Sequence, residues 1–175
     1  MGADRLRAFA LAAVVLAAVV LCAACGGATP ETGGATVDSA RDGDTILLDG
    51  GRRVRLVQID APELGRECHG DQAAAALDRL APPGTEVRLE RDPGLDDVDR
   101  HGRLLRYVHA GGRNVTLELV RIGAAAPYFY RGERGLYARR LVAAAREAQT
   151  GRRGLWGACS GARLIPERQV ETGPP

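Results

Sequence analysis

The alternation of apolar and polar positions divides most of the chain into short strands and a few helices. Short alternating or apolar runs, bounded by Asp, Gly and Pro residues, predict five strands. These strands cover residues 35–40, 45–48, 54–59, 86–90 and 104–109. The sequence Asp49-Gly50-Gly51 predicts a tight turn, so we expect the second and third strands to form a hairpin.

Three segments place their apolar residues on one face of a helix. The first covers residues 71–80 and stops before Pro82-Pro83-Gly84, and the second covers residues 116–122 and stops at Gly123. The third has an apolar face made of Tyr137, Leu141, Ala144, Ala145 and Ala148. Periodicity alone supports a small α+β or barrel domain, and the order of elements suits a five-stranded OB-type barrel with three packed helices.

The N-terminal segment has the pattern of an export signal. Two arginines precede an unbroken apolar run that ends at Cys25, as in a secretory signal. The run is short and Ala-rich for a helix that crosses a membrane, which needs roughly 20 residues. The end of the run resembles a bacterial lipobox with Cys25 as the acylated residue, although Cys22 stands where that motif prefers Leu. Cleavage at an Ala-x-Ala-like site and an uncleaved anchor are the alternatives, and all three export the domain.

These patterns divide the chain into four parts. We expect a signal at residues 1–25, a flexible Gly-rich tether at 26–34, a domain at 35–160 and a loose tail at 161–175. The full chain has 24 basic and 22 acidic side chains in 175 residues, and every basic one is Arg. This near balance disfavours a strongly basic nucleic-acid-binding protein, and an apolar content of 45% excludes wholesale disorder.

Four polar motifs interrupt the pattern, and each one alone has an ordinary explanation. Asp42-Gly43-Asp44-Thr45 is typical of a polar turn, and Ile59-Asp60-Ala61-Pro62-Glu63 is typical of a loop at a proline. Arg55 lies in a strand between apolar neighbours, which is consistent with a solubility charge on an edge strand. Arg103 follows Gly102 and reads as a surface arginine.

The order of these motifs resembles the staphylococcal nuclease family. Asp-Gly-Asp-Thr, Val-Arg-Leu, Ile-Asp-Ala-Pro-Glu and Asp-Arg-His-Gly-Arg-Leu follow one another with compatible spacing. Further matches are Asn114-Val115, residues 119–123, Tyr128-Phe129-Tyr130 and Gly154-Leu155-Trp156. The resemblance extends from about Thr36 to Cys159 and implies a nuclease-like OB-type barrel. It also implies Ca²⁺-dependent hydrolysis of DNA and RNA with little sequence preference, leaving 3′-phosphate ends.

The resemblance implies one metal site and one catalytic group. Asp44 and Asp60 match the carboxylates that bind Ca²⁺, and the main-chain carbonyl of Ala61 matches a further ligand. Such oxygen atoms suit Ca²⁺, which tolerates irregular coordination. Glu63 matches the glutamate that activates the attacking water, whereas its ordinary explanation is an exposed turn residue.

The arginines and aromatic residues match groups that hold the substrate. Arg55 and Arg103 match the two arginines that bind the scissile phosphate, for which the forked guanidinium is well suited. Four further residues match positions beside the nucleotide: Arg100, His101, Tyr128 and Tyr130. His101 is an unusual choice for a phosphate contact and also suits a solvated loop, while one tyrosine could belong to the core.

Two cysteines remain after the signal. In an exported protein Cys68 and Cys159 most economically pair, which closes a loop of 91 residues and stabilises by about 4–5 kcal/mol on the chain-entropy model. A metal site at Cys68 and His69 lacks further ligands. The acidic sequence at residues 92–97 is expected to be a solvated turn.

Two functions from different classes are consistent with these observations. The first is an exported, monomeric, Ca²⁺-dependent nuclease that meets the membrane only through its N-terminal anchor. The second is a binding module that keeps the nuclease fold without catalysis. The presence of all five of Asp44, Arg55, Asp60, Glu63 and Arg103 favours the enzyme. The small net charge predicts weak, salt-sensitive capture of substrate.

Overall fold

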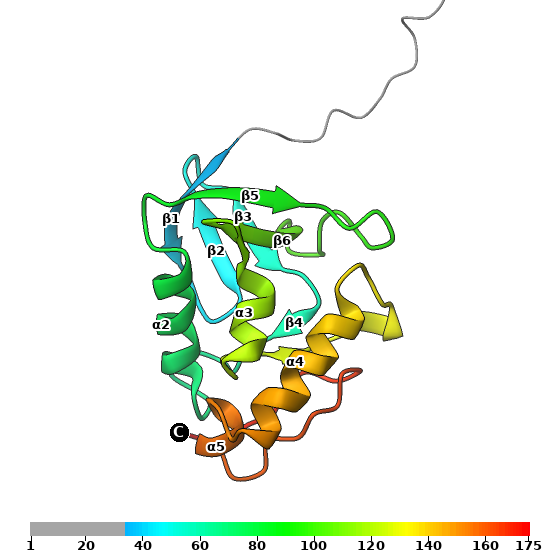
Figure 1. The fold of residues 1–175 in the computed structure, drawn as a ribbon. Helices are drawn as coiled ribbons and strands as arrows, with labels where there is room; N and C mark the ends of the chain where they lie inside the picture. Colours follow the sequence, from blue (N-terminus) through cyan, green and yellow to red (C-terminus); the bar gives the residue numbers. More distant parts are fainter. Residues whose placement is uncertain (1–33) are drawn as a thin grey trace, which may run out of the picture. The chain divides into compact units, whose positions relative to one another are not determined.

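The computed structural model describes residues 34–175, and five strands in this region form a closed barrel (Figure 1). They are β1 (Ala35–Ala40), β2 (Thr45–Leu48), β3 (Arg53–Leu56), β5 (Glu86–Glu90) and β6 (Leu104–Ala110). The strands pair in the order β3-β2-β1-β5-β6, and β6 also pairs with β3, which closes the barrel. The five-stranded barrel expected from the sequence is therefore confirmed.

The predicted signal at residues 1–25, its Cys25 and the tether up to residue 33 lie outside the described residues. In the described part of the chain, no helix combines the length and the hydropathy that a membrane crossing requires.

The closing contact of the barrel is parallel, whereas its other strand pairs are antiparallel. β3 pairs with β2 through the predicted hairpin, with Thr45 opposite Arg55. On its other side β3 runs parallel to β6, with Arg55 opposite Leu105. Arg55 thus lies on an interior strand, so its interpretation as an edge-strand charge is wrong.

Three helices pack against the barrel, as the sequence predicts (Figure 1). They are α2 (Gly70–Leu80), α3 (Val115–Arg121) and α4 (Ala138–Thr150), followed by the single turn α5 (Leu155–Ala158). The side chain of Asn114 accepts a hydrogen bond from the Leu117 N–H and caps the start of α3. The predicted apolar face of α4 is buried except at its first residue, Tyr137, which is half-buried.

The core lies between the barrel and these helices. Alternate strand residues and one face of each helix supply it, as binary patterning requires. Its fully buried large side chains include Val37, Ile46, Leu48, Val54, Leu56, Leu77, Leu119, Phe129 and Leu141.

The strand predicted at residues 54–59 is interrupted in the structure. β3 ends at Leu56, the chain turns at Gln58, and β4 (Ile59–Asp60) pairs with β8 (Ala126–Pro127) instead. Gln58 has a left-handed backbone with a φ of 64°. Its side chain accepts from the Tyr107 hydroxyl and donates to the Glu133 carbonyl, which offsets the strain of this conformation.

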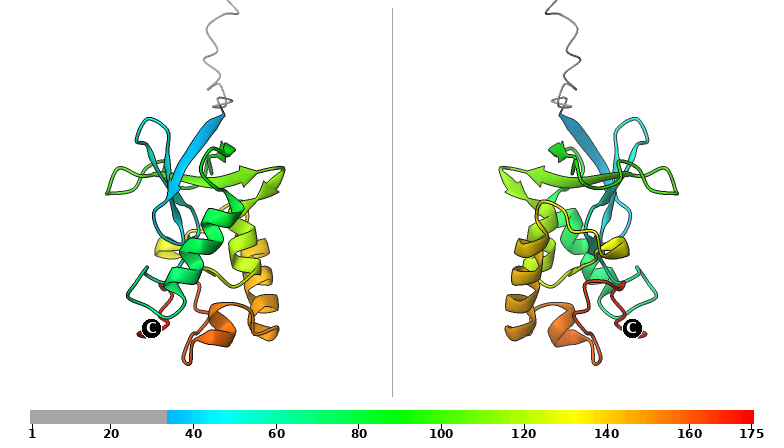
Figure 2. Two further views of the ribbon diagram at one scale, coloured as in Figure 1. Left: turned by 90° about the vertical axis from the view of Figure 1, so that its left-hand side faces the viewer. Right: turned by 90° about the vertical axis from the view of Figure 1, so that its right-hand side faces the viewer.

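The C-terminal segment has no helix or strand after residue 160, yet it is not the loose tail that the sequence suggested. Val170 and Thr172 are buried, and Val170 packs in a small apolar cluster with Trp156 and Cys159. The Cys68 N–H donates to the Gly173 carbonyl, so this segment runs beside the loop before α2 (Figure 2). We call residues 166–173 the C-terminal strap.

Candidate active site

Barrel closure assembles three of the predicted site residues from distant parts of the sequence. Asp44 immediately precedes β2, Arg55 lies in β3 and Arg103 immediately precedes β6. Because β3 pairs with both β2 and β6, Asp44 and Arg103 come to lie on either side of Arg55.

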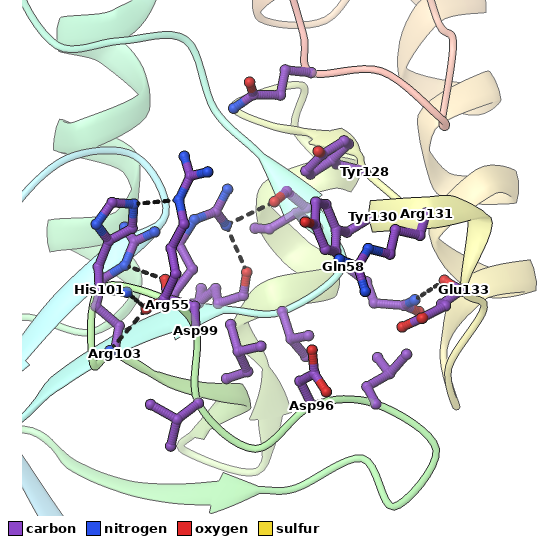
Figure 3. Close-up of a pocket in the computed structure, with 18 residues that line it drawn as sticks. Arg55, Gln58, Asp96, Asp99, His101, Arg103, Tyr128, Tyr130, Arg131 and Glu133 are labelled. Carbon is purple, nitrogen blue, oxygen red and sulfur yellow. Dashed lines mark hydrogen bonds and ion pairs between the residues drawn. The ribbon is translucent and has the colours of Figure 1, made fainter.

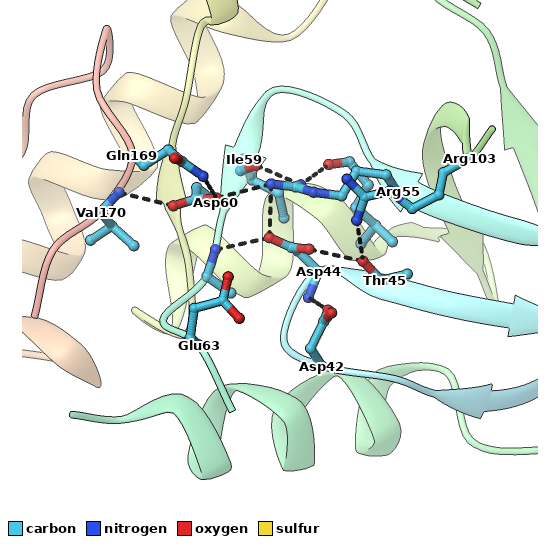
Figure 4. Close-up of polar contacts among 12 residues, drawn as sticks. Asp42, Asp44, Thr45, Arg55, Ile59, Asp60, Glu63, Arg103, Gln169 and Val170 are labelled. Carbon is cyan, nitrogen blue, oxygen red and sulfur yellow. Dashed lines mark hydrogen bonds and ion pairs between the residues drawn. The ribbon is translucent and has the colours of Figure 1, made fainter. Parts of the chain in front are cut away.

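Arg55 is the centre of this arrangement (Figure 4). Its Nη2 contacts Asp44 Oδ2 at 2.9 Å and Asp60 Oδ1 at 3.0 Å. Its Nη1 donates to the carbonyls of Leu56 at 2.8 Å and Ile59 at 2.7 Å. These four bonds hold a side chain that is only 13% exposed, and they leave the Nε–H as its remaining donor.

The two carboxylates beside Arg55 are themselves buried and hydrogen-bonded. Asp44 accepts from the Ala61 N–H at 3.0 Å and from the Thr45 hydroxyl at 3.1 Å. Asp60 accepts from the Val170 N–H at 2.9 Å. Gly43 permits this approach, because a Cβ there would lie 2.6 Å from the Cβ of Ala61.

One arginine compensates these two carboxylates only in part. Burial raises the pKa of Asp44 to about 7, and the opposing effect of Arg55 is smaller. Burial also raises the pKa of Asp60 against the effect of Arg55. Two buried carboxylates with one positive partner leave local negative charge, which together with the oxygen donors fits a hard divalent cation such as Ca²⁺.

A cation here would need ligands besides side chains. Within residues 34–175, no three His, Cys, Asp or Glu side chains lie close enough to hold a metal ion by themselves. Ala61 is buried next to Asp60, and its carbonyl is the main-chain ligand that the family resemblance implies. Waters or substrate oxygens would supply the rest, as is usual for Ca²⁺ sites.

Arg103 is joined to the same cluster through a hydroxyl. Its Nε contacts Asp99 Oδ2 at 2.7 Å, and its Nη1 lies 3.3 Å from Thr45 Oγ1. Burial alone would raise the pKa of Asp99, but hydrogen bonds from Arg103 and from the His101 N–H outweigh it and lower this pKa. Asp99 therefore stays charged and orients Arg103.

Glu63 lies on the loop between β4 and α2, beside the carboxylate cluster (Figure 4). It is exposed, and its carboxylate makes no hydrogen bond or ion pair with any other described residue. Its N–H donates to Glu67 Oε2 at 2.7 Å, which holds the loop in place. A carboxylate without a partner in the described part of the chain is available to accept a proton.

The remaining predicted residues surround one cavity of about 400 Å³ (Figure 3). Figure 3 shows Arg55, Arg103 and His101 on one side of this cavity, and Tyr128 and Tyr130 with Arg131 on the other. Six predicted residues line it: Arg55, Arg100, His101, Arg103, Tyr128 and Tyr130. Cations that face aromatic rings across a cavity of this size suit a nucleotide with its phosphate.

The two tyrosines differ in exposure. Tyr128 is half-buried and Tyr130 is 53% exposed, with their ring centroids 6.5 Å apart. Phe129 between them is fully buried in the core. Both tyrosine rings are thus open to the cavity, which is consistent with a role beside the substrate.

Comparison with known proteins gives the family directly. The family model described as staphylococcal nuclease homologue matches residues 53–158. The chain belongs to the staphylococcal nuclease family.

Several proteins with nuclease names are similar to this homologue. A thermonuclease from Staphylococcus hyicus is 31% identical over 123 residues, which cover 66% of this chain and 70% of that protein. Endonuclease YncB from Bacillus subtilis is 36% identical over 98 residues, 51% of this chain and 46% of that protein. Endonuclease YhcR from the same organism is 34% identical over 108 residues, 53% of this chain and 9% of that protein. The chain thus spans less than half the length of the two Bacillus proteins.

In this staphylococcal nuclease homologue, sequence reasoning missed several residues that complete the site. Thr45 and Asp99 connect Arg103 to the cluster. Both lie inside the predicted motifs, but the motifs assign a role only to their neighbours. The loop at residues 95–98 lines the cavity and is more than a solvated turn. Gln169 and Val170 bond to Asp60 from far along the chain, and no sequence pattern indicates that contact.

Proposed function

We propose that this chain is an exported, Ca²⁺-dependent phosphodiesterase that hydrolyses DNA and RNA with little sequence preference and leaves 3′-phosphate ends. The observation that carries the proposal is the Arg55 guanidinium between two buried carboxylates, next to a cavity that Arg103 also lines. Membership of a nuclease family and relatives named as endonucleases and a thermonuclease support it.

The mechanism assigns a separate task to each group. Ca²⁺ held by Asp44, Asp60 and the Ala61 carbonyl would supply positive charge to the phosphate and acidify water. The Glu63 carboxylate takes a proton from the water as its oxygen bonds to phosphorus. The bond between phosphorus and the 5′ oxygen breaks, and that oxygen takes a proton from solvent.

The arginines stabilise charge on the phosphate oxygens. Arg103 donates from the cavity wall, while Arg55 offers its Nε–H first. The Nη2 of Arg55 becomes available once Asp44 and Asp60 have another positive partner. The tyrosines of the cavity stack against a base, which is tolerant of sequence because every base has a π-face.

The alternative is a binding module that holds nucleic acid without cleaving it. A cavity lined by Arg100, His101 and Tyr130 would serve binding equally well. Glu63, which is exposed and has no partner within residues 34–175, favours the enzyme, because binding an anion gains nothing from a nearby carboxylate.

Removal of calcium tests the proposal. We expect the purified full chain to release acid-soluble nucleotides from DNA and RNA with Ca²⁺, and to lose about 100-fold or more of this activity with chelator. Asp44→Asn should abolish the response to Ca²⁺, whereas Asp49→Asn, an exposed carboxylate in the β2–β3 turn, should not. Cleavage that survives chelation contradicts the mechanism, and retention of nucleic acid without cleavage would favour the binding module.

Export is a further part of the proposal, as a lipoprotein acylated at Cys25 or as a secreted protein. It is supported by the sulfur atoms of Cys68 and Cys159, which lie at bonding distance with Cα atoms 5.8 Å apart. Disulfides persist in oxidising compartments and are rare in the cytosol.

The disulfide gives the export proposal its own test. Protein isolated from its host should have the mass of the oxidised form, and reduction should add two hydrogens. The double variant Cys68→Ser with Cys159→Ser should lose about 2–5 kcal/mol of unfolding free energy in urea. Free thiols in the protein as isolated would contradict both the bond and an oxidising location.

A further inference from the structure

The C-terminal strap contacts three segments that carry predicted active-site groups. At its start the Phe129 N–H donates to the Pro166 carbonyl at 2.6 Å, between the two tyrosines of the cavity. In its middle the Val170 N–H donates to Asp60 Oδ2 at 2.9 Å. At its end the Cys68 N–H donates to the Gly173 carbonyl at 2.8 Å, on the loop that carries Glu63.

The strap is anchored well enough to hold these contacts. Val170 is 6% exposed and packs with Trp156 and Cys159 in the second apolar cluster. Thr172 is equally buried, and its hydroxyl donates to the Cys68 carbonyl at 2.8 Å. The sulfur atoms of Cys68 and Cys159 meet beside these contacts. The loop at Cys68 is therefore linked both to Cys159, which precedes the strap, and to the end of the strap itself.

The contact with Asp60 has a direct consequence for a cation. A backbone N–H on Oδ2 fixes the plane of the carboxylate and leaves Oδ1 directed toward Arg55 (Figure 4). Groups that orient a ligand in this way contribute to metal affinity although they never touch the metal. The Val170 N–H is thus placed to position the carboxylate rather than merely to cover it.

Gln169 reaches the substrate side of the same carboxylate. Its backbone is part of the strap, while its side chain lines the cavity together with Tyr128 and Arg55. Its Nε2 lies 3.5 Å from Asp60 Oδ1, a long contact that leaves most of the amide's hydrogen-bonding capacity for another partner. An exposed amide beside aromatic rings can donate to a base or a phosphate.

We propose that the C-terminal strap, which lies outside the residues matched by the family, is a working part of this active site. In it the Val170 N–H positions Asp60 for the cation and the Gln169 amide contacts the nucleotide. This inference rests on the proposed Ca²⁺-dependent nuclease function. It extends the site by two groups and makes residues 169–173 necessary for full affinity.

Two truncations separate the strap from the rest of the tail. A chain that ends at Arg168 lacks the Val170 donor and the contacts to Cys68, whereas a chain that ends at Gly173 keeps all of them. We expect the first to bind Ca²⁺ about 10- to 100-fold more weakly in isothermal titration calorimetry, and the second to match the full chain. Val170→Pro deletes the N–H and should give the same loss, so the test stands even where the shorter chain does not fold. Val170→Ala keeps the N–H but gives up packing against Trp156 and Cys159, and as the matched control it should keep the Ca²⁺ Kd of the full chain.

Gln169→Ala tests the second group. It should raise KM for single-stranded DNA about 2- to 10-fold, as for loss of one hydrogen bond, with kcat and the Ca²⁺ Kd nearly unchanged. A KM equal to that of the full chain would overturn the nucleotide contact.

The outcomes distinguish this inference from the proposed function. One outcome is an unchanged Ca²⁺ Kd in both Val170→Pro and the chain ending at Arg168, in protein that still cleaves DNA. That result overturns the proposed role of the strap and leaves the proposed nuclease function standing. A full chain that neither binds Ca²⁺ nor cleaves overturns both. Hydrogen exchange needs no metal. Rapid exchange of the Val170 and Cys68 N–H groups in the full chain would by itself overturn the proposed role of the strap.

Discussion

Glu63→Gln is expected to lower kcat by about 10²- to 10⁴-fold, the usual contribution of a general base. The substitution keeps the shape of the side chain and removes its ability to take a proton. Because Glu63 is exposed and its carboxylate is unpaired among residues 34–175, the melting temperature should change little. KM and the Ca²⁺ Kd should also stay close to those of the full chain.

The measurement is the release of acid-soluble nucleotides at saturating DNA and Ca²⁺. Glu147→Gln, an exposed glutamate on α4, is the matched control and should keep full kcat. An unchanged kcat in Glu63→Gln, or an effect on KM alone, would remove Glu63 from the chemical step.

Arg55→Met is expected to have the largest effect on stability. It leaves the buried carboxylates of Asp44 and Asp60 without their shared positive partner, a change that typically costs about 3–5 kcal/mol. Arg103→Met is the control, because its partner Asp99 keeps hydrogen bonds from two backbone N–H groups. That control should lose about 1 kcal/mol or less.

The loss in Arg55→Met should depend on pH. Burial raises the pKa of Asp44 to about 7 in the folded protein, so the folded chain binds a proton that the unfolded chain releases near pH 4. The folded state therefore loses stability as pH rises through this window, and removal of Arg55 raises the pKa of Asp44 further. Urea unfolding with chelator should show a smaller loss at pH 5 than at pH 8, and an equal loss at both would contradict this account.

The strands and helices were predictable because their apolar patterns are local. β2, the start of β3 and the helices α2 and α4 lie within a residue or two of their expected positions. The interruption at Gln58 was not predictable, since a left-handed glutamine carries no sequence signal and is maintained by residues from distant segments, such as Tyr107.

The residues of the site were predictable from the sequence, but the hydrogen bonds and ion pairs between them were not. Family motifs pointed to Arg55 and Asp60, while Arg55 alone read as a surface charge because its parallel neighbour Leu105 lies 50 residues further along the chain. The contact of Val170 with Asp60 uses a backbone N–H, a group that every residue except proline carries. Contacts of this kind become visible only when the chain is folded.

The parallel pairing of β3 with β6 also sets when the candidate site is assembled during folding. Pairings between distant segments are among the slowest to form, because the intervening chain must first lose its freedom. Asp44 and Arg55 can meet within a hairpin, but Arg103 joins them only when β6 pairs with β3. Partly folded chains therefore hold an incomplete cluster, and the candidate site is complete only in the finished barrel.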